Sequence, residues 1–336
     1  MNCIDCIITW VDGSDKEWIL NKNKYTGNDK TCEDYESERY RDLGILKYLF
    51  RGIDLFMPWI RNVYFVTCGQ KPEWLNEKCS KLKFINHSDY IPKKYLPTFS
   101  SHTIEMNFHR INGLSEQFIY FNDDMFVLKS TKETDFFKDG LPCDAAVFNA
   151  IAMKKSDKDF RFLMPINDIE IINKHFDKSK CIRKNWTKYF NLKYGKDIIR
   201  TLCLLPWIHF TGFYNYHFPY SLSKETLEIL WKEETKVLDS TCKHKFRNSN
   251  DVNIWLALYW QYASGKFFPR SPKIGNLTCI SDDLFANELL YNHVKNRQTK
   301  LIVINDNIKN ADIDNIKLRL VDAFDHILPN KSSFEK

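Results

Sequence analysis

The stretch LPTFSSHTIEMNFHRINGLSEQFIYFNDDMF, residues 96–126, contains a short aromatic and β-branched run followed at once by two acids. The run Gln117–Phe121 has the composition of a buried strand. Asn122, Asp123 and Asp124 come directly after it, and in open α/β sheets ligand-binding loops gather at the carboxyl ends of the strands. Two carboxylates beside a carboxamide supply hard oxygen ligands, which suit Mg²⁺ or Mn²⁺ bound together with substrate phosphates. The alternative is an ordinary turn, because Asn and Asp are common turn residues.

The residues that precede this strand predict a helix over residues 100–112. On such a helix His102, Glu105 and His109 share one polar face, while apolar residues occupy another face that can pack on the sheet. The polar face would then look toward the acidic end of the strand. The alternative is a polar face that is simply solvated.

Outward from this region the chain alternates apolar runs with amphipathic stretches. The predicted strands are residues 4–11, 62–67, 81–85 and 145–150, and the predicted helices are residues 40–56, 223–236, 252–264 and 312–328. This order predicts an α/β, Rossmann-like fold with a largely parallel sheet. Residues 151–205 are rich in Lys and Asn and predict a helical insertion or cap over the site.

Polar turns follow the first two predicted strands. Asp12 and Gly13 end the first strand in an acidic glycine turn, which predicts a nucleotide or metal loop. A strand-to-helix turn with an N-cap is the alternative. Thr67 ends the next strand in the same way, ahead of Gly69, so we expect it to lie at the same edge of the sheet.

Three arginines lie at or on the helix predicted over residues 40–56. Arg39, Arg41 and Arg51 are natural phosphate clamps if they reach a nucleotide site. Otherwise they are solvated side chains.

A second informative region follows residue 209. His217 begins the sequence His-Phe-Pro, which is a rigid loop because proline restricts the residue before it. Arg247 lies just ahead of the helix predicted over residues 252–264, with Asn250 as a suitable N-cap and Gly265 as a suitable residue after its end. A guanidinium beside the free backbone N–H groups of a helix start predicts an anion site, and a surface arginine is the alternative.

The composition of the 336-residue chain narrows the class of protein. Hydrophobic residues make up 43%, enough for a sizeable core, and the net charge of +6 is mildly basic. That charge suits an anionic small molecule or a membrane surface, and it does not indicate a nucleic-acid partner. The first residues lack the basic region of a signal peptide, and no apolar run approaches the ~18–20 residues of a membrane span. The 10 Cys show no metal-binding spacing, so we expect them to be reduced. We therefore expect the protein to be in the cytoplasm, either free or at the inner face of the membrane.

Four blocks of this sequence resemble the conserved blocks of the Stealth proteins. This family includes bacterial capsular polysaccharide phosphotransferases and the catalytic core of the N-acetylglucosamine-1-phosphotransferase. The blocks are IITWVDGSD (7–15), then RYRD through PWIRNVYFVTCGQKPEWL to LPTFSSHTIE and YFNDD (39–124), then HFP with FRNSNDVN (217–253), and INDN with PNKSSFE (304–335). They occur in order and span nearly the whole chain, which is therefore identified as a single Stealth-type catalytic domain over residues 1–336.

The resemblance implies transfer of a sugar 1-phosphate from a nucleotide sugar to an acceptor hydroxyl, which forms a phosphodiester and releases a nucleoside monophosphate. By match to the family's motifs, Glu105, Asp124, His217 and Arg247 line the active site. Asp124 with Asp123 would hold Mg²⁺ or Mn²⁺, and Arg247 would stabilise charge on the oxygens of the attacked phosphorus. Either His217 or Glu105 would take the proton from the acceptor, a choice that the sequence leaves open.

The substrates follow from the same resemblance. The abundance of Lys, Asn and Ile favours a bacterial source. The expected donor is then a UDP-sugar such as UDP-GlcNAc, with UMP as the product, and the expected acceptor is a capsular or cell-surface polysaccharide or oligosaccharide. The predicted nucleotide-sugar-binding residues are Asp12, Gly13, Arg39, Arg41, Asp42, Thr67 and Asn122. At His102 the chain departs from relatives that often have proline, which implies a change in acceptor choice.

Two other functions fit the same residues. A metal-dependent glycosyltransferase would use a similar fold and acidic turn to move the sugar alone, and a non-catalytic protein would only bind a nucleotide sugar or glycan. We expect peripheral association with the membrane capsule machinery and no nucleic-acid partner. The sequence does not indicate an oligomeric state.

Overall fold

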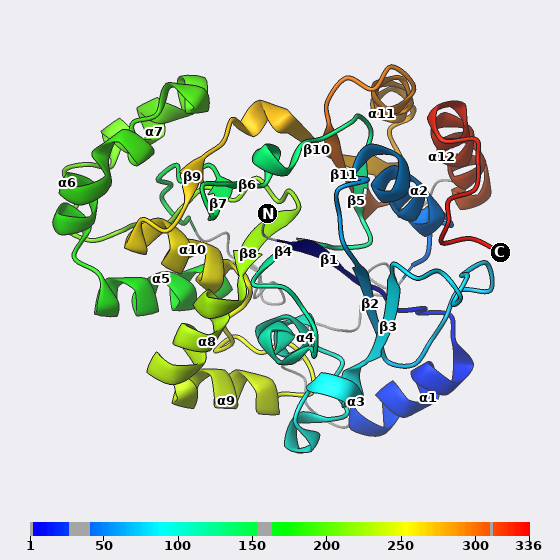
Figure 1. Ribbon diagram of the computed structural model, residues 1–336, viewed down its shortest axis with the longest axis horizontal. Helices are drawn as coiled ribbons and strands as arrows, with labels where there is room; N and C mark the ends of the chain where they lie inside the picture. Colours follow the sequence, from blue (N-terminus) through cyan, green and yellow to red (C-terminus); the bar gives the residue numbers. More distant parts are fainter. Residues whose placement is uncertain (1–2, 27–40, 153–162, 310–311) are drawn as a thin grey trace.

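The largest sheet lies in the middle of the molecule, with helices around it (Figure 1). This computed structural model describes residues 3–26, 41–152, 163–309 and 312–336. The sheet has the strand order β3-β2-β1-β4-β8, and its strands are β1 (Ile4–Thr9), β2 (Val63–Thr67), β3 (Leu82–Asn86), β4 (Gln117–Phe121) and β8 (Tyr220–Ser223). The first four are parallel and β8 is antiparallel to β4. The predicted α/β, Rossmann-like fold with a largely parallel sheet is therefore confirmed.

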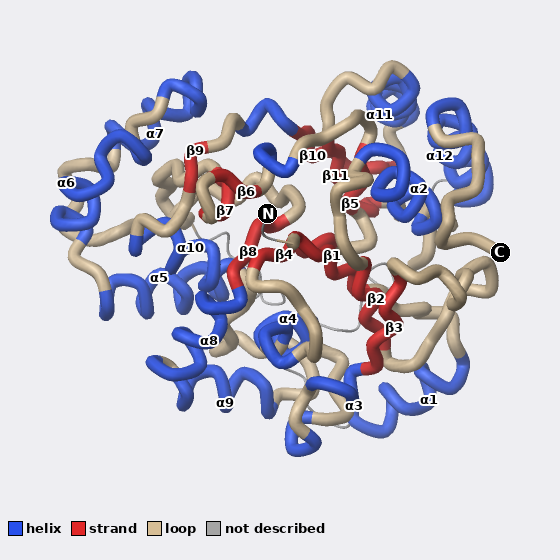
Figure 2. Tube along the Cα trace, viewed as in Figure 1, coloured by secondary structure: helices blue, strands red, loops and turns tan. Residues whose placement is uncertain are grey.

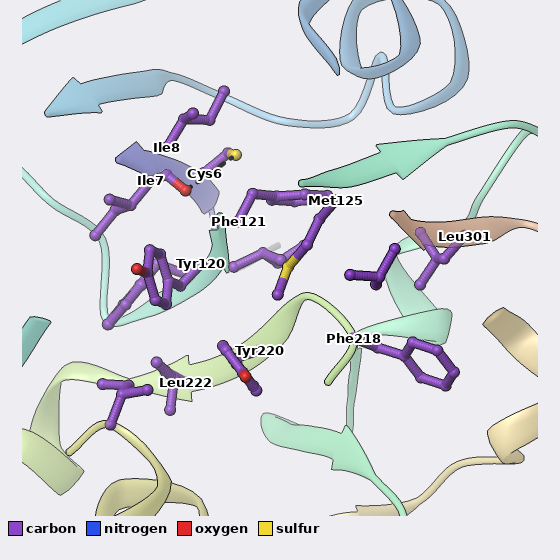
Figure 3. Packing of buried hydrophobic residues seen from close by; sticks show 14 of the residues in the cluster. Cys6, Ile7, Ile8, Tyr120, Phe121, Met125, Phe218, Tyr220, Leu222 and Leu301 are labelled. Atoms are coloured by element: carbon purple, nitrogen blue, oxygen red, sulfur yellow. Dashed lines mark hydrogen bonds between the residues drawn. The ribbon is translucent and has the colours of Figure 1, made fainter. Parts of the chain in front are cut away.

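The central strands are apolar on both faces because both faces are covered. Every residue of β2 and β4 is buried. In Figure 1, α2 (Leu46–Phe56) and α4 (Ser101–Met106) lie on opposite sides of these strands. Figure 3 shows the resulting core, in which side chains of β1, β4 and β8 lie close together.

The direction in which the chain crosses the sheet changes at β1. From β1 the chain runs outward through β2 to β3, and it then returns to place β4 on the other side of β1. In open α/β sheets ligands bind outside the carboxyl ends of the strands at such a switch point. The carboxyl ends of β1 and β4 are therefore the expected position of the site.

A second sheet begins at that position. Its order is β10-β11-β5, with the strands β10 (Gly275–Ser281), β11 (Leu301–Asn307) and β5 (Met125–Val127). Asn122, Asp123 and Asp124 form the whole connection from β4 to β5, so this acidic turn is held between two sheets. A third, small sheet contains β6 (Phe137–Lys138), β7 (Leu141–Asp144) and β9 (Phe268–Pro269).

Helices form the outer part of the described chain, as the tube in Figure 2 shows. In addition to α2 and α4 they are α1 (Lys16–Tyr25), α3 (His87–Tyr90), α5 (Leu163–His175), α6 (Lys178–Tyr189), α7 (Ile198–Cys203), α8 (Lys224–Glu233), α9 (Thr235–Lys243), α10 (Trp255–Ser264), α11 (Leu284–Lys295) and α12 (Ile313–Ile327). The described part of residues 151–205 is thus mostly helical; its role as a cap stays a prediction. Within the described ranges no helix combines the length and apolar character that crossing a bilayer requires.

Two predicted elements differ most from the structure, and the helices expected over residues 40–56 and 252–264 begin later than predicted, at Leu46 and Trp255. The strand expected over residues 145–150 is wrong, because β7 ends at Asp144 and the apolar residues that follow are buried in a loop. The helix expected over residues 100–112 stops at Met106, and a short 3₁₀ turn follows. Asn107 explains the break, since its side-chain Nδ2 donates to the Thr103 carbonyl at 2.8 Å and competes with the backbone hydrogen bonds.

Arg51 on α2 is neither solvated nor part of a phosphate site. Its guanidinium is buried and donates to both carboxylate oxygens of Glu335, at 2.9 and 2.8 Å. A third bond reaches the Leu328 carbonyl at 2.7 Å. This ion pair fastens residues 329–336 to α2.

We expect Glu335→Ala to lower the free energy of unfolding by about 3 kcal/mol, because it leaves the buried guanidinium of Arg51 without its main partner. Glu225→Ala is the matched control, since it removes an exposed ion pair with Lys266 and should cost less than about 1 kcal/mol. Urea unfolding followed by circular dichroism gives both values. Equal effects of the two substitutions would contradict the anchoring role of Glu335.

Candidate active site

Three cavities meet at the carboxyl ends of β1 and β4. We call them the first, second and third cavity, with volumes of about 580, 210 and 400 Å³. Asn122 and Arg247 line all three. Asp124 lies between the first and second, Glu105 between the second and third, and His217 between the first and third. The four residues matched to the family's active site therefore surround one junction, although they come from distant parts of the chain.

The acidic turn is held rigidly at this junction. The Met125 N–H donates to the Asn122 carbonyl at 3.2 Å, and the Ile304 N–H of β11 donates to the Asp124 carbonyl at 2.9 Å. These bonds place the side chains of Asp123 and Asp124 in the first and second cavities.

The two carboxylates of this turn differ in their surroundings. Oδ1 of Asp124 is buried and has no hydrogen-bond partner within the described part of the chain. Desolvation, and then the charge of Asp124, raise the pKa of Asp123 to about 7. The side chain of Asp123 is nevertheless exposed, so solvent screens part of the repulsion between the two carboxylates.

These residues fit a divalent cation that is held mainly by substrate and water. An unpaired buried carboxylate oxygen needs a donor or a cation, and the close pair of acids is destabilised until positive charge arrives. The described ranges contain no group of three or more His, Cys, Asp and Glu side chains arranged to hold a metal. Mg²⁺ commonly uses only one or two protein carboxylates together with phosphates and water. Asp124 with Asp123 thus stays the predicted site for Mg²⁺ or Mn²⁺.

His217 is held in a strained backbone conformation, with φ of +55°. Its N–H donates to Asn215 Oδ1 at 2.7 Å, and its ring Nε2 lies 3.5 Å from Asp124 Oδ2. The other ring nitrogen, Nδ1, lies 2.8 Å from the Tyr220 hydroxyl. The strain turns the ring toward the junction.

The contacts of Tyr220 indicate which nitrogen of His217 carries the proton. The indole N–H of Trp255 can only donate, and it donates to the Tyr220 hydroxyl at 3.1 Å. Among the described residues, Nδ1 of His217 is the one acceptor with a hydrogen-bond contact to this hydroxyl, so we infer that the hydroxyl donates its proton to Nδ1. We infer that a neutral His217 carries its proton on Nε2, which faces Asp124. In this tautomer His217 is a hydrogen-bond donor at the junction.

Glu105 is in a different environment. It is 6% exposed, and its Oε1 accepts a hydrogen bond from the Tyr120 hydroxyl at 3.0 Å. Burial raises the pKa of Glu105, and the nearby charges of His102 and Arg247 and the bonds from Tyr120 and Ser101 offset part of that rise. A carboxylate with a raised pKa is a stronger base than an ordinary one.

Arg247 reaches the junction without the start of α10 (Trp255–Ser264) beside it. The predicted helix begins only at Trp255, so Asn250 is not its N-cap, whereas Gly265 follows its end with φ of +74° as predicted. Arg247 Nη2 donates to Ser101 Oγ at 2.9 Å. This bond aims the guanidinium into the cavities, and among the described residues Arg247 is the only Lys or Arg in the lining of the second cavity.

The structure places some of the residues predicted to bind the nucleotide sugar in the lining of the cavities and others outside it. Arg41, Asp42 and Asn122 line the first cavity, although Arg41 Nη1 is also bonded to Asp306 Oδ2 at 3.0 Å. Arg39 lies outside the described residues.

Asp12, Gly13 and Thr67 are not in the lining of the three cavities, and they shape the loops behind the second one. The carboxamide of Gln70 joins the two loops, because its Oε1 accepts from the Asp12 N–H at 2.9 Å and its Nε2 donates to the Asp12 carbonyl at 3.0 Å. The Thr67 hydroxyl donates to the Gln70 carbonyl at 2.8 Å. These predicted residues thus position the loops.

His109, which was predicted to share a helix face with Glu105, lies on a different element. His109 follows the break in α4, and its ring packs against Trp231, so the expected shared face with Glu105 is wrong. His102 does line the third cavity, and its Nδ1 lies 3.1 Å from the buried carboxylate of Asp251. That carboxylate lies 2.6 Å from His244 Nδ1 as well.

Sequence reasoning missed Gln70, Tyr220, Trp255 and Asp251. Tyr220 lies only three positions after His217, a signal that was available. The other three act through contacts between separate elements, which no local pattern reveals.

Comparison with known proteins shows which family the chain resembles. Residues 4–30 match Stealth protein CR1, conserved region 1, and residues 39–143 match Stealth protein CR2, conserved region 2. The chain is 40% identical to a capsular polysaccharide phosphotransferase of Streptococcus pneumoniae, over 100% of this chain and 99% of the relative. It is 39% identical to an exopolysaccharide phosphotransferase of Lactiplantibacillus plantarum, over 99% and 96%. It is 37% identical to a receptor polysaccharide phosphotransferase of Streptococcus oralis, over 100% of both chains.

We expect Tyr220→Phe to change the tautomer of His217, because Nδ1 loses its hydrogen-bond donor. In the unchanged protein ¹⁵N NMR of the histidine rings should show neutral His217 with its proton on Nε2, and in the variant a mixture of both tautomers. Tyr216→Phe is the control, since its hydroxyl bonds to Asp197 instead. An unchanged His217 signal in Tyr220→Phe would disprove the inferred tautomer.

Proposed function

This chain belongs to the Stealth family and is a phosphotransferase, and we propose that it moves a hexose 1-phosphate from a UDP-sugar to a hydroxyl of a capsular or cell-surface polysaccharide. The proposed sugar is an N-acetylhexosamine, as in UDP-GlcNAc, and the products are a phosphodiester and UMP. The observation that carries this proposal is the junction of three cavities around Glu105, Asp124, His217 and Arg247. The names of the relatives support the polysaccharide acceptor. We place the reaction in the cytoplasm, at the inner face of the membrane.

The three cavities match the three groups on the phosphorus under attack. The leaving UMP, the sugar that stays attached and the incoming acceptor each need room. The second cavity reaches the carboxyl ends of β1 and β2, where doubly wound sheets bind nucleotides, and Trp10 and Phe99 are in its walls. We assign it to uridine. The first cavity is the largest and takes the sugar, and the third takes the acceptor.

Arg247 is assigned to the phosphates. It lines all three cavities, so its guanidinium can stay in contact with the oxygens of the phosphorus while the bond to UMP breaks and the bond to the acceptor forms. Asp124 and Asp123 would hold Mg²⁺ or Mn²⁺, which when bound neutralises the charge of the pyrophosphate. In the inferred tautomer Nε2–H of His217 faces the same region, 3.5 Å from Asp124 Oδ2, and would donate to a phosphate oxygen there.

Glu105 is assigned as the base that takes the proton from the acceptor hydroxyl. It lines the third cavity, and its raised pKa makes it the stronger acceptor of a proton. His217 lines that cavity too, but the hydrogen bond from Tyr220 occupies Nδ1 and leaves a proton on Nε2. The choice that the sequence leaves open is therefore made for Glu105 in this proposal.

Product analysis separates the proposal from its alternatives. The protein is mixed with UDP-GlcNAc, Mn²⁺ and capsule oligosaccharides, and the nucleotide products are separated by chromatography. We expect UMP whose release depends on acceptor and stops when the cation is chelated. Arg247→Ala should lower the rate by about 10²–10³-fold. UDP in place of UMP would mean that the sugar alone moves, and binding of the donor without any release would favour a non-catalytic protein.

The pH dependence of kcat/KM tests the assignment of Glu105. Its carboxylate form is the base, so activity should fall as the pH drops through the raised pKa of this group. Tyr120→Phe removes a hydrogen bond that favours the carboxylate, so the pKa and the acid limb of the profile should move to higher pH. Glu105→Gln should lower kcat by about 10²–10⁴-fold.

The control for this experiment is Tyr95→Phe, which loses a hydrogen bond to the distant Asp239. It should leave the acid limb in place. If Tyr120→Phe leaves the limb unmoved as well, and Glu105→Gln keeps near-normal turnover, Glu105 is not the base.

A further inference from the structure

One surface of the molecule exposes apolar side chains in a continuous run. Leu205, Pro206, Trp207 and Ile208 are all exposed, and the side chain of Ile208 is 81% accessible. Four consecutive exposed apolar residues are unfavourable in water, and such runs are expected only where they serve a function. The helices beside them add further exposed apolar side chains. We define the α6–α7 patch by Trp186, Leu192, Ile199, Leu202, Leu205, Trp207 and Ile208.

A buried lysine holds this loop in its shape. Lys178 is 3% exposed, and its ammonium group donates to the Leu204 carbonyl at 2.6 Å and to the Trp207 carbonyl at 2.6 Å. The carbonyls of the loop thus turn inward to the ammonium group, and the side chains of Trp207 and Ile208 remain outside. The exposure of these side chains is therefore part of an ordered structure.

The charge of the molecule is concentrated around the patch. Residues 177–209 carry eight Lys and Arg and two Asp, a net charge of +6 that equals the net charge of the whole chain. Arg183, Lys184 and Lys196 are exposed on α6 and the following turn. The remainder of the chain has no net charge, so a negatively charged surface would attract this part of the molecule in particular.

A second set of exposed apolar side chains, on α11, differs from the α6–α7 patch in the charges around it. Leu284 and Phe285 on α11 are 68% and 72% exposed. The charges beside them are balanced, because Lys295 pairs with Asp322 on α12 and Arg319 pairs with Glu288. Apolar exposure by itself is therefore not special to the α6–α7 patch, whereas its combination with unbalanced positive charge is.

We propose that the α6–α7 patch docks on a membrane surface that contains anionic lipid. Trp and aliphatic side chains flanked by Lys and Arg are the composition of segments that lie in the interface of a bilayer. Figure 1 shows α6 and α7 (green) at the edge of the molecule, away from the central strands, where a flat surface can approach them. The helix before them, α5, contributes Met164 to the third cavity.

Vesicle flotation with the full chain tests this proposal. The vesicles contain either phosphatidylcholine alone or phosphatidylcholine with phosphatidylglycerol. We expect binding to the anionic vesicles that weakens as salt is added and is at least about tenfold weaker without phosphatidylglycerol. The assay needs no substrate, so its result does not depend on the proposed transfer reaction.

Two pairs of substitutions locate the surface. Trp207→Ser with Ile208→Ser should weaken vesicle binding about tenfold or more, and Leu284→Ser with Phe285→Ser, equally exposed and also adjacent, should not. Arg183→Glu with Lys184→Glu should weaken it similarly, while Lys16→Glu with Lys24→Glu on α1 makes the same change of net charge elsewhere and should have a smaller effect. Circular dichroism confirms that each variant is folded.

The proposal is overturned if the chain does not float with anionic vesicles, or if the Trp207 and Ile208 variant binds them as tightly as the unchanged chain. It is also overturned if the patch joins two copies of the chain. In that case light scattering would show a dimer that Trp207→Ser with Ile208→Ser dissociates, with no change in vesicle binding.

Discussion

The connection from β4 to β5 is the constraint on which the candidate site depends. Three residues, Asn122, Asp123 and Asp124, pass from the parallel sheet into the second sheet, so neither end of the turn is free to move. The turn also lies at the switch point of the strand order, where neighbouring connections leave in opposite directions and open a crevice. Two carboxylates forced together in a partly desolvated crevice repel each other, and a cation or a cationic side chain relieves that repulsion. The position of Arg247 at the same junction follows from this requirement.

Most buried polar groups elsewhere in the molecule have partners, and the contrast with the junction is informative. Arg51 is neutralised by Glu335, and the carboxylate of Asp251 lies between two histidine rings and accepts the Asn248 N–H. At the junction, Oδ1 of Asp124 has no hydrogen-bond partner within the described ranges, and His217 keeps a backbone conformation that is unfavourable for a residue with a side chain. Natural proteins keep such costs mainly where they serve function. The junction therefore carries two such costs, although Oδ2 of the buried Asp168 also lacks a partner among the described residues.

The sequence was sufficient for the elements whose stability is local or whose composition is extreme. β4 was predicted residue for residue, because an aromatic and β-branched run ended by Asn-Asp-Asp is typical of a buried strand. The helix predicted over residues 312–328 matches α12 to within one residue at each end, and the structure shows Asp312 as its N-cap. The errors arose where tertiary contacts override local preference. Asn107 interrupts a helical pattern with its own side chain, and the apolar residues after Asp144 are buried in a loop that resembles a strand in composition.

The same limit applies to the candidate site. The four residues at the junction came from matched motifs, and their convergence came only from the fold. Tyr220 and Trp255 lie on β8 and α10, and nothing in either local sequence shows that they form a chain of hydrogen bonds ending on His217. We infer a chemical role from that chain, since a histidine whose Nδ1 accepts a hydrogen bond presents a donor on its other side. Glu105 and His217 are both ordinary candidates for a base by residue type. Their neighbours separate them, because burial strengthens the basicity of one and a tyrosine hydroxyl occupies the accepting nitrogen of the other.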